Sequence, residues 1–329
     1  MTDWPAWAHP AVTTALAGVG VVRPWAHQVA AADLARAGHD VVLATGTASG
    51  KSVGYQLPAL SAIADDPRAT VLYLAPTKAL AADQLQALTA LRLPDLRAAT
   101  YDGDTPAQER EWVRGHANWV LTNPDMLHLA LLPHHSAWAR LWRRLAYVVV
   151  DECHAYRGVF GSHVALVLRR LLRIARLYRS TPVVVLASAT SVDPAVAAGR
   201  LVGRPVRAVT QDESSRPAVD VVLWEPGPDA LAGADGAEES DGSVDVASGR
   251  PRRRPSAPAA AARLTADLVA GGARTLTFVR ARQGAEQVAV AARRHLRRTA
   301  PELEQRVAAY RGGYLPEDRR DLERALDSG

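Results

Sequence analysis

The segment from residue 45 to residue 52 has the residue types that wrap the phosphates of a nucleotide. Small residues let backbone N–H groups approach the phosphates, a lysine contacts the β and γ phosphates, and a hydroxyl contacts Mg²⁺. A glycine is missing from the strict pattern, because Thr45 stands at its place five residues before Gly50. We predict an ATP-binding loop of Thr45, Gly46, Thr47, Ala48, Ser49, Gly50, Lys51 and Ser52.

Two acids, Asp151 and Glu152, close an apolar run about 100 residues after Lys51. In a sheet that already carries a phosphate loop, one carboxylate can hold Mg²⁺ through water, and its neighbour can orient and deprotonate the attacking water. We assign Asp151, together with Ser52, to Mg²⁺ and Glu152 to proton abstraction. Lys51, Asp151, Glu152 and His154 are the predicted catalytic residues.

A third polar cluster, Ser188-Ala189-Thr190, follows another apolar run. Taken alone, such a triplet is only a helix N-cap. Its place in the order, after the loop and the acidic pair, favours a second role. We expect its hydroxyls to hydrogen-bond His154 or Glu152 and to couple nucleotide state to the rest of the domain.

Short apolar runs separated by longer amphipathic stretches must position these residues. Continuous apolar strands separated by helices predict an α/β fold, a doubly wound parallel sheet covered on both faces, whose ligands lie at the carboxyl ends of the strands. The predicted strands are 41–44, 71–74, 119–121, 147–150 and 183–186, and the predicted helices are 78–91, 106–115 and 163–178.

Changes in composition divide the chain into three predicted parts. Residues 1–215 form the ATP-binding domain. Residues 216–259 combine an acidic stretch with an arginine cluster and many small residues, which predicts a disordered linker or insert. Residues 260–329 restart the α/β pattern, with predicted strands at 275–279 and 306–310 and three predicted helices.

Overall composition limits the classes of protein. The formal net charge of +5 and a pI of about 9.6 favour a polyanionic partner. One cysteine allows no internal disulfide, no signal peptide is evident, and no run approaches 18 apolar residues, so we expect a cytoplasmic protein without a membrane partner. Lys51 and Lys78 are the only lysines, and a compact ammonium fits a tight phosphate pocket better than a planar guanidinium.

Five motifs resemble those of the superfamily 2 helicases and stand in the same order, at residues 45–52, 75–80, 122–125, 151–154 and 188–190. The resemblance extends over about residues 20–215 and more thinly over 260–329. The resemblance implies a RecA-like P-loop NTPase domain and the start of a second, with ATP and Mg²⁺ as cofactors. It also implies that Gln28 pairs with adenine, whose edge offers a donor and an acceptor. The implied nucleic-acid track consists of Pro76, Thr77, Lys78, Gly103, Asp104, Thr122, Asn123, Arg280 and Arg311.

Within that superfamily, the stretch DECHAYRGVFGSH at residues 151–163 resembles the bacterial mitomycin-repair helicases and their fungal relatives, close to the RecQ-like group. The resemblance implies a DNA helicase or translocase, related to DNA repair, that moves 3′ to 5′ on single-stranded DNA. Contacts to the backbone position a protein without reading sequence, so we expect no sequence preference. A monomer is favoured, and an RNA helicase remains an alternative.

Two further alternatives differ in class. The late arginine motif of such motors does not occur after Ala260, so we expect an incomplete second domain, either a fragment or a truncated product. A nucleotide-gated nucleic-acid-binding protein with little unwinding would fit that expectation. A small-molecule kinase would account for the phosphate loop but not for residues 122–125 and 188–190.

Overall fold

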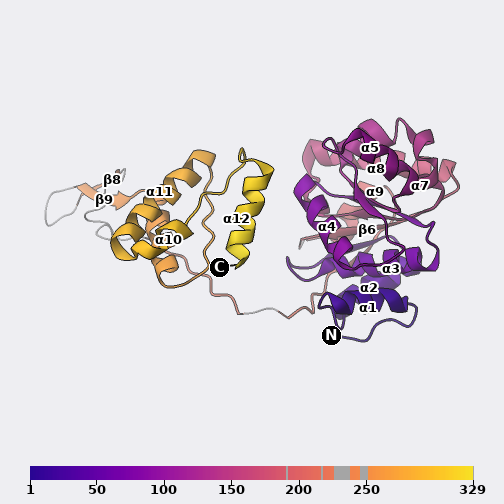
Figure 1. Ribbon diagram of the computed structural model, residues 1–329, viewed down its shortest axis with the longest axis horizontal. Helices are drawn as coiled ribbons and strands as arrows, with labels where there is room; N and C mark the ends of the chain where they lie inside the picture. The colour runs from indigo at the N-terminus through magenta and orange to yellow at the C-terminus, as the bar shows by residue number, and fades with distance from the viewer. Residues whose placement is uncertain (190–191, 216–217, 226–237, 245–250, 329) are drawn as a thin grey trace. The chain divides into compact units, whose positions relative to one another are not determined.

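The structure is a computed structural model that describes residues 1–189, 192–215, 218–225, 238–244 and 251–328. The chain divides into two compact units, residues 1–217 and residues 218–329, and each is described here by itself (Figure 1). Among the helices in the described ranges, none is long and apolar enough to cross a membrane.

Seven parallel strands form the sheet of the first unit, in the order β3-β4-β2-β5-β6-β1-β7. All five predicted strands are present, which confirms the doubly wound parallel sheet. The two edge strands were not predicted, because each has three residues that are not fully buried and forms no apolar run. The strands are β1 (Val41–Ala44), β2 (Thr70–Leu74), β3 (Ala98–Thr100), β4 (Trp119–Thr122), β5 (Leu145–Val150), β6 (Val183–Ser188) and β7 (Arg207–Val209).

Helices cover both faces of this sheet (Figure 1). Alternate strand residues point to opposite faces, so Val148 and Val150 join the core beneath α8, whereas Tyr147 and Val149 join the core beneath α3. The helices are α1 (Pro10–Gly18), α2 (Ala26–Arg36), α3 (Lys51–Asp65), α4 (Lys78–Ala90), α5 (Ala107–His116), α6 (Pro124–Met126), η1 (Leu127–Leu131), η2 (His135–Trp138), α7 (Ala139–Arg143), η3 (Cys153–Ala155), α8 (Gly158–Leu177) and α9 (Pro194–Val202).

The second unit contains three longer helices and a hairpin. The hairpin strands β8 and β9 pair antiparallel inside the predicted linker, of which residues 216–217, 226–237 and 245–250 lie outside the described ranges. The elements are β8 (Glu238–Val244), β9 (Pro251–Pro255), α10 (Ala257–Ala270), α11 (Arg282–Thr299), η4 (Pro301–Arg306) and α12 (Pro316–Ser328).

The two strands predicted for this unit, at 275–279 and 306–310, are not formed in the described residues. A strand requires a neighbouring strand to receive its backbone hydrogen bonds, and here each segment lies against a helix instead. The hydroxyl of Thr277 lies 2.6 Å from that of Thr265 on α10, and the carbonyl of Val307 accepts from Arg293 Nε on α11 at 2.6 Å.

Candidate nucleotide site and nucleic-acid track

Because all seven strands of the first unit run parallel, their carboxyl ends share one edge of the sheet, and the strand order divides this edge into two halves. The neighbouring strands β5, β6 and β1 end at the acidic pair, at Ser188 and at the phosphate loop. The neighbouring strands β3, β4 and β2 end at segments of the implied nucleic-acid track. Topology therefore separates the two predicted functions.

The phosphate loop turns sharply between β1 and α3. Gly50 has φ 71° and Ala48 has φ 58°, both in the left-handed region. A Cβ atom on Gly50 would lie 2.6 Å from the side-chain nitrogen of Gln28, so glycine is required there. Lys51 Nζ donates to the carbonyl oxygens of Gly46 at 2.7 Å and Thr45 at 3.3 Å. The ammonium is thus held inside the loop that phosphates would fill.

Thr45, which replaces a glycine of the strict pattern, stabilises the loop through a side-chain hydrogen bond. It is buried, and its hydroxyl lies 2.7 Å from that of Ser49, which donates to the Gly46 carbonyl at 2.9 Å. Its backbone is not left-handed, so glycine's freedom is not needed at this position. Threonine in place of glycine at position 45 is therefore compatible with the conformation of the loop.

Gln28 and His27 lie beneath the same loop. Gln28 Nε2 donates to the Gly50 carbonyl at 2.8 Å, and Gln28 Oε1 accepts from the Trp25 amide at 2.8 Å. His27 Nε2 lies 3.0 Å from the Ser49 carbonyl. Both side chains are buried. In this structure the Gln28 amide is committed to the loop, so its adenine role stays a prediction.

Asp212 and His27 also contact the loop, and neither was identified from the sequence. Asp212 Oδ2 accepts from the Gly46 amide at 3.0 Å, although it lies 166 positions away in the chain. His27 Nδ1 accepts from the Glu213 amide at 3.4 Å, which fits a neutral ring protonated on Nε2. No local pattern singles out Asp212, whereas the buried His27 stands next to the predicted Gln28.

Asp151 is held by two donors at the end of β5. The Tyr73 hydroxyl on β2 donates to Asp151 Oδ2, and the Glu152 amide donates to Oδ1 at 2.9 Å. Burial raises the pKa of Tyr73 far above its ordinary value of 10.0, so its hydroxyl stays a donor. A tyrosine in an apolar strand gave no signal in the sequence beyond packing.

A second buried tyrosine connects this carboxylate to the phosphate loop. Tyr55 lies on α3, its ring centroid is 6.0 Å from that of Tyr73, and its hydroxyl donates to Gln84 Oε1 on α4 at 3.1 Å. Burial raises the pKa of Tyr55, the Asp151 charge raises it further, and a hydrogen bond with Ser52 lowers it. Ser52 therefore contacts Tyr55, and Asp151 is close enough to act on its pKa through charge.

The predicted Mg²⁺ donors suit that ion. Mg²⁺ is bound by hard oxygen ligands, commonly one or two carboxylates with waters and phosphate oxygens. Asp151 and Ser52 offer a carboxylate and a hydroxyl on neighbouring elements, and both Asp151 oxygens are already oriented by donors. The residues present fit the ion.

Glu152 and His154 form the part of the site that can move a proton. Glu152 has φ 46°, a left-handed conformation that is costly for a non-glycine residue and that clusters at functional sites. Its Oε2 lies 3.0 Å from His154 Nδ1, and the same nitrogen lies 3.2 Å from the Ala189 amide. Protonated, Nδ1 donates to Glu152; unprotonated, it accepts from Ala189. The ring therefore engages one partner at a time.

The expectation for Ser188-Ala189-Thr190 is changed by this geometry. The contact to His154 comes from the backbone amide of Ala189 rather than from a hydroxyl. The Ser188 side chain instead hydrogen-bonds Cys153, whose thiol pKa is raised by burial to about 12. Thr190 lies outside the described residues.

The other half of the sheet edge carries the implied track. Lys78 Nζ donates to Asp104 Oδ2 at 2.6 Å, which raises the lysine pKa, and a Cβ on Gly103 would lie 3.7 Å from the same nitrogen. Thr77, preceded by Pro76, is the N-cap of α4, and its hydroxyl accepts from the Leu80 amide at 3.3 Å. The structure thus brings these residues together at one surface.

Thr122 and Asn123 stand at the end of β4 with different exposure. Thr122 is buried, and its hydroxyl donates to the Tyr101 carbonyl at 2.6 Å. Asn123 is partly exposed and caps α6 by accepting from the Met126 amide at 2.8 Å. Of the two, only Asn123 presents side-chain atoms that a phosphate could reach.

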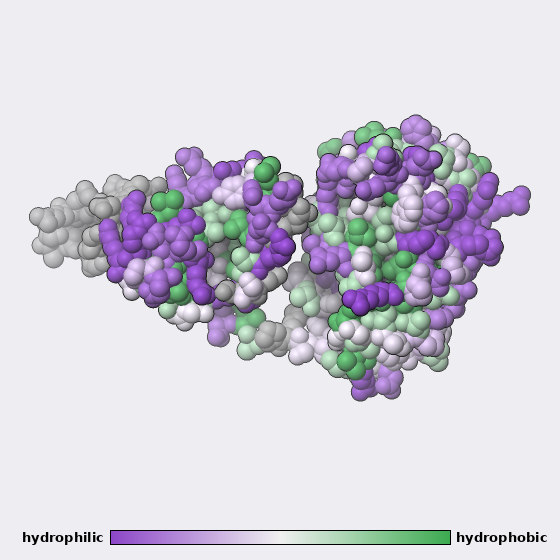
Figure 2. Space-filling model, viewed as in Figure 1, coloured by the Kyte–Doolittle hydropathy of each residue, from purple (hydrophilic) through white to green (hydrophobic). Residues whose placement is uncertain are grey.

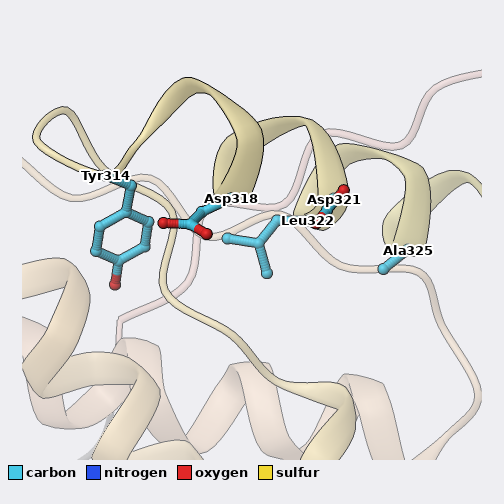
Figure 3. Close-up of a pocket in the computed structure, with 5 residues that line it drawn as sticks. All are labelled: Tyr314, Asp318, Asp321, Leu322 and Ala325. Atoms are coloured by element: carbon cyan, nitrogen blue, oxygen red, sulfur yellow. The ribbon is translucent and has the colours of Figure 1, made fainter.

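Arg280 and Arg311 belong to the second unit. Arg280 is exposed, whereas Arg311 Nε donates to Glu286 Oε1 at 2.8 Å, the same oxygen that accepts from Tyr314 at 2.5 Å. Figure 3 shows the residues that line a pocket beside α12: Tyr314, which precedes the helix, and Asp318, Asp321, Leu322 and Ala325 on it. Its charged lining is acidic, so it does not suit a phosphate.

Comparisons with known proteins agree with this geometry. The model of the DEAD/DEAH box helicase family matches residues 25–197. The "Uncharacterized ATP-dependent helicase YprA" of Bacillus subtilis is 37% identical over 321 residues, which are 97% of this chain and 40% of that protein. The "ATP-dependent helicase HRQ1" of Saccharomyces cerevisiae is 35% identical over 314 residues, 93% of this chain and 28% of that protein.

A solved structure shows the same fold. The helicase MrfA, in a crystal structure with DNA and AMPPNP, superposes with a TM-score of 0.80 at 35% identity, over 99% of this chain and 43% of that chain. This likeness confirms the RecA-like class predicted from the sequence. The chain spans less than half the length of each of these three proteins.

Proposed function

The chain belongs to the DEAD/DEAH box helicase family, and we propose that it is the portion of a helicase motor that binds and hydrolyses ATP to move along and separate DNA strands. One observation carries the proposal. The loop that ends at Lys51 and the Asp151-Glu152 pair, far apart in sequence, follow strands β1 and β5, which are separated only by β6, on the sheet edge that also carries the residues of the implied track.

The loop residues bind and orient the nucleotide. Lys51 exchanges its two loop carbonyls for phosphate oxygens, and the backbone amides that begin α3 point to the same phosphates. Bound Mg²⁺, held through Asp151 and Ser52, would neutralise charge on the β and γ phosphates. Asp151 keeps its orientation through the Tyr73 hydroxyl.

Glu152 accepts the proton of the attacking water. His154 can take this proton from Glu152 on Nδ1 and then donates to the Glu152 carboxylate, whereas an unprotonated Nδ1 accepts from the Ala189 amide. Ala189 stands after β6, which lies between the two functional strands β5 and β1. A single proton on His154 Nδ1 is therefore enough to exchange the contact with the Ala189 backbone for one with the Glu152 carboxylate.

The finer features of the proposal concern the nucleic acid. We propose single-stranded DNA as the partner, bound through its backbone without sequence preference, and 3′ to 5′ movement in a cytoplasmic, monomeric DNA-repair enzyme. The DECH form of residues 151–154 supports this reading, and so does the presence of DNA in the MrfA structure. Lys78 and Gly103 supply exposed groups for phosphates, and Asn123 supplies a partly exposed one.

The test compares ATP binding and ATP hydrolysis in two variants. Lys51→Ala should lose nucleotide binding, measured with a fluorescent ATP analogue, because it removes the ammonium at the phosphates. Glu152→Gln should bind the analogue normally and lose turnover by about 100-fold or more, the range of a lost general base. Equal loss of binding in both variants would contradict the assigned roles.

The partner is tested in the wild-type chain. ATPase rates are measured with single-stranded DNA, with single-stranded RNA and without nucleic acid, and we expect the greatest stimulation by DNA. Stimulation by RNA alone would favour an RNA helicase. Nucleotide binding without stimulation by either would favour a nucleotide-gated binding protein.

A further inference from the structure

The positive charge of the first unit is concentrated in one segment. Residues 126–189 contain nine arginines and only two acids, Asp151 and Glu152, both of which lie at the nucleotide site. The remainder of the first unit has slightly more acids than bases. A charge imbalance this local is not produced by an evenly arginine-rich composition.

Five of these arginines are exposed on α7, on α8 or just after it, and we call them together the arginine surface: Arg143, Arg169, Arg173, Arg176 and Arg179. On α8, three of them follow at intervals of four and three residues, which places them in one stripe. The opposite side of α8 is buried against the sheet. Hydrophilic side chains gather on the side of the first unit that carries these helices (Figure 2).

No carboxylate in the described ranges forms an ion pair with any of these five guanidiniums. By contrast, the described arginines elsewhere in the first unit include several in ion pairs, such as Arg23 with Asp3 and Arg68 with Asp66. A helix C-terminus favours cations by about 0.3–1 kcal/mol each, which accounts for Arg143 and Arg176 in the last turns of α7 and α8 but not for Arg169 and Arg173 further back on α8.

The arginine surface is separate from both halves of the sheet edge. Helix α8 begins at Gly158, close to the carboxyl end of β5, and runs back toward the amino end of β6. Arg173 is 15 residues beyond Gly158, which corresponds to about 22 Å along the helix axis. Its guanidinium therefore takes no part in ATP chemistry or in the track at Lys78.

We propose that the arginine surface binds the phosphate backbone of duplex nucleic acid, outside the track that handles the single strand. This inference rests on the proposed helicase function. Guanidinium forks suit phosphate oxygens, and the stripe from Arg169 to Arg176 extends about 10 Å, the rise of about three nucleotides of one strand. The surface would hold the duplex that has yet to be separated.

A duplex fits this surface better than a single strand does. Proteins that bind single strands combine positive charge with aromatic rings on which bases stack. Tyr178, the aromatic side chain at the end of α8, is already engaged: its hydroxyl lies 2.9 Å from His135 Nδ1, and its ring faces Arg143 at 6.0 Å. Charge without a free stacking ring is typical of sequence-independent duplex binding.

The test removes two charges and keeps the length of the side chains. The variant Arg173→Gln/Arg176→Gln leaves Arg169, which donates to the Arg200 carbonyl at 2.9 Å and packs on Gly203. Affinity for a fluorescent blunt duplex is measured by anisotropy across salt concentrations. Each lost phosphate contact reduces the slope of log K against log salt by about 0.9, so we expect a reduction of about 1.8.

The matched control, Arg23→Gln/Arg68→Gln, removes the same charge from two exposed ion pairs and should keep the wild-type slope. Single-stranded affinity and DNA-stimulated ATPase should be unchanged in both variants.

An unchanged duplex slope, or an equal loss with the control, would overturn the inference while leaving the proposed function standing. If the Arg173→Gln/Arg176→Gln variant loses binding to polyglutamate but keeps its affinity for the duplex, the surface binds an acidic protein and the inference is wrong. A wild-type chain that binds neither strand form would contradict both proposals.

Discussion

Replacing Tyr73 by phenylalanine removes a single hydroxyl and keeps the ring that packs against Tyr55. The hydroxyl is buried and donates to Asp151 Oδ2, so its loss leaves a carboxylate oxygen without that donor. A hydrogen bond to a charged group contributes about 1.5–3 kcal/mol. We expect Tyr73→Phe to lower the free energy of unfolding of the first unit by that amount, which corresponds to a decrease in Tm of roughly 3–12 °C.

The matched control is Tyr55→Phe, which removes an equally buried hydroxyl whose partners include neutral groups, the amide oxygen of Gln84 at 3.1 Å and the hydroxyl of Ser52. It should cost about 0.5–1.5 kcal/mol. Urea unfolding followed by tryptophan fluorescence suits the comparison, because seven of the eight tryptophans lie in residues 1–217. If Tyr73→Phe costs no more than Tyr55→Phe, Asp151 does not depend on this donor.

Three further substitutions or reactions probe other parts of the first unit. Gly50→Ala places a Cβ 2.6 Å from Gln28 Nε2 in a left-handed backbone, so nucleotide affinity should fall by at least about tenfold, as measured by equilibrium binding. Burial raises the pKa of the Cys153 thiol from 9.0 to about 12, so near pH 8 it should hold about 1,000-fold less thiolate than an exposed cysteine. It should therefore react with a disulfide reagent about 1,000-fold more slowly, until urea unfolds the chain. Asp40→Asn breaks the buried pair with Arg204 and should cost about 3–5 kcal/mol in urea unfolding, whereas a cost below 1 kcal/mol would show that the pair is dispensable.

The part of the site that the sequence predicts is the part that local chemistry determines. Glycine, lysine and hydroxyl at the end of an apolar run predict the loop, and two adjacent acids at the end of another predict the catalytic pair. Parallel strands place both at one edge. The predicted positions of Lys51 and Glu152 at strand ends follow from residue types alone.

The supporting residues depend on tertiary contacts that no local pattern contains. Tyr73 belongs to a strand whose residues are all buried, and only the pairing of β2 with β5 brings its hydroxyl to Asp151. Asp212 reaches Gly46 across 166 positions. In the second unit, apolar residues at 275–279 satisfied the pattern of a strand, but a strand requires a partner, and the described residues of that unit provide none.

Because the chain has only two lysines, each half of the sheet edge carries a single reactive side-chain amine. Apart from the α-amino group, an amine-reactive reagent finds only Lys51 in the nucleotide half and Lys78 in the nucleic-acid half. Modification of the first amine competes with phosphate, and modification of the second competes with the backbone of a bound strand and with Asp104. Mass spectrometry of two peptides can therefore follow the occupancy of both halves in one sample, without an introduced probe.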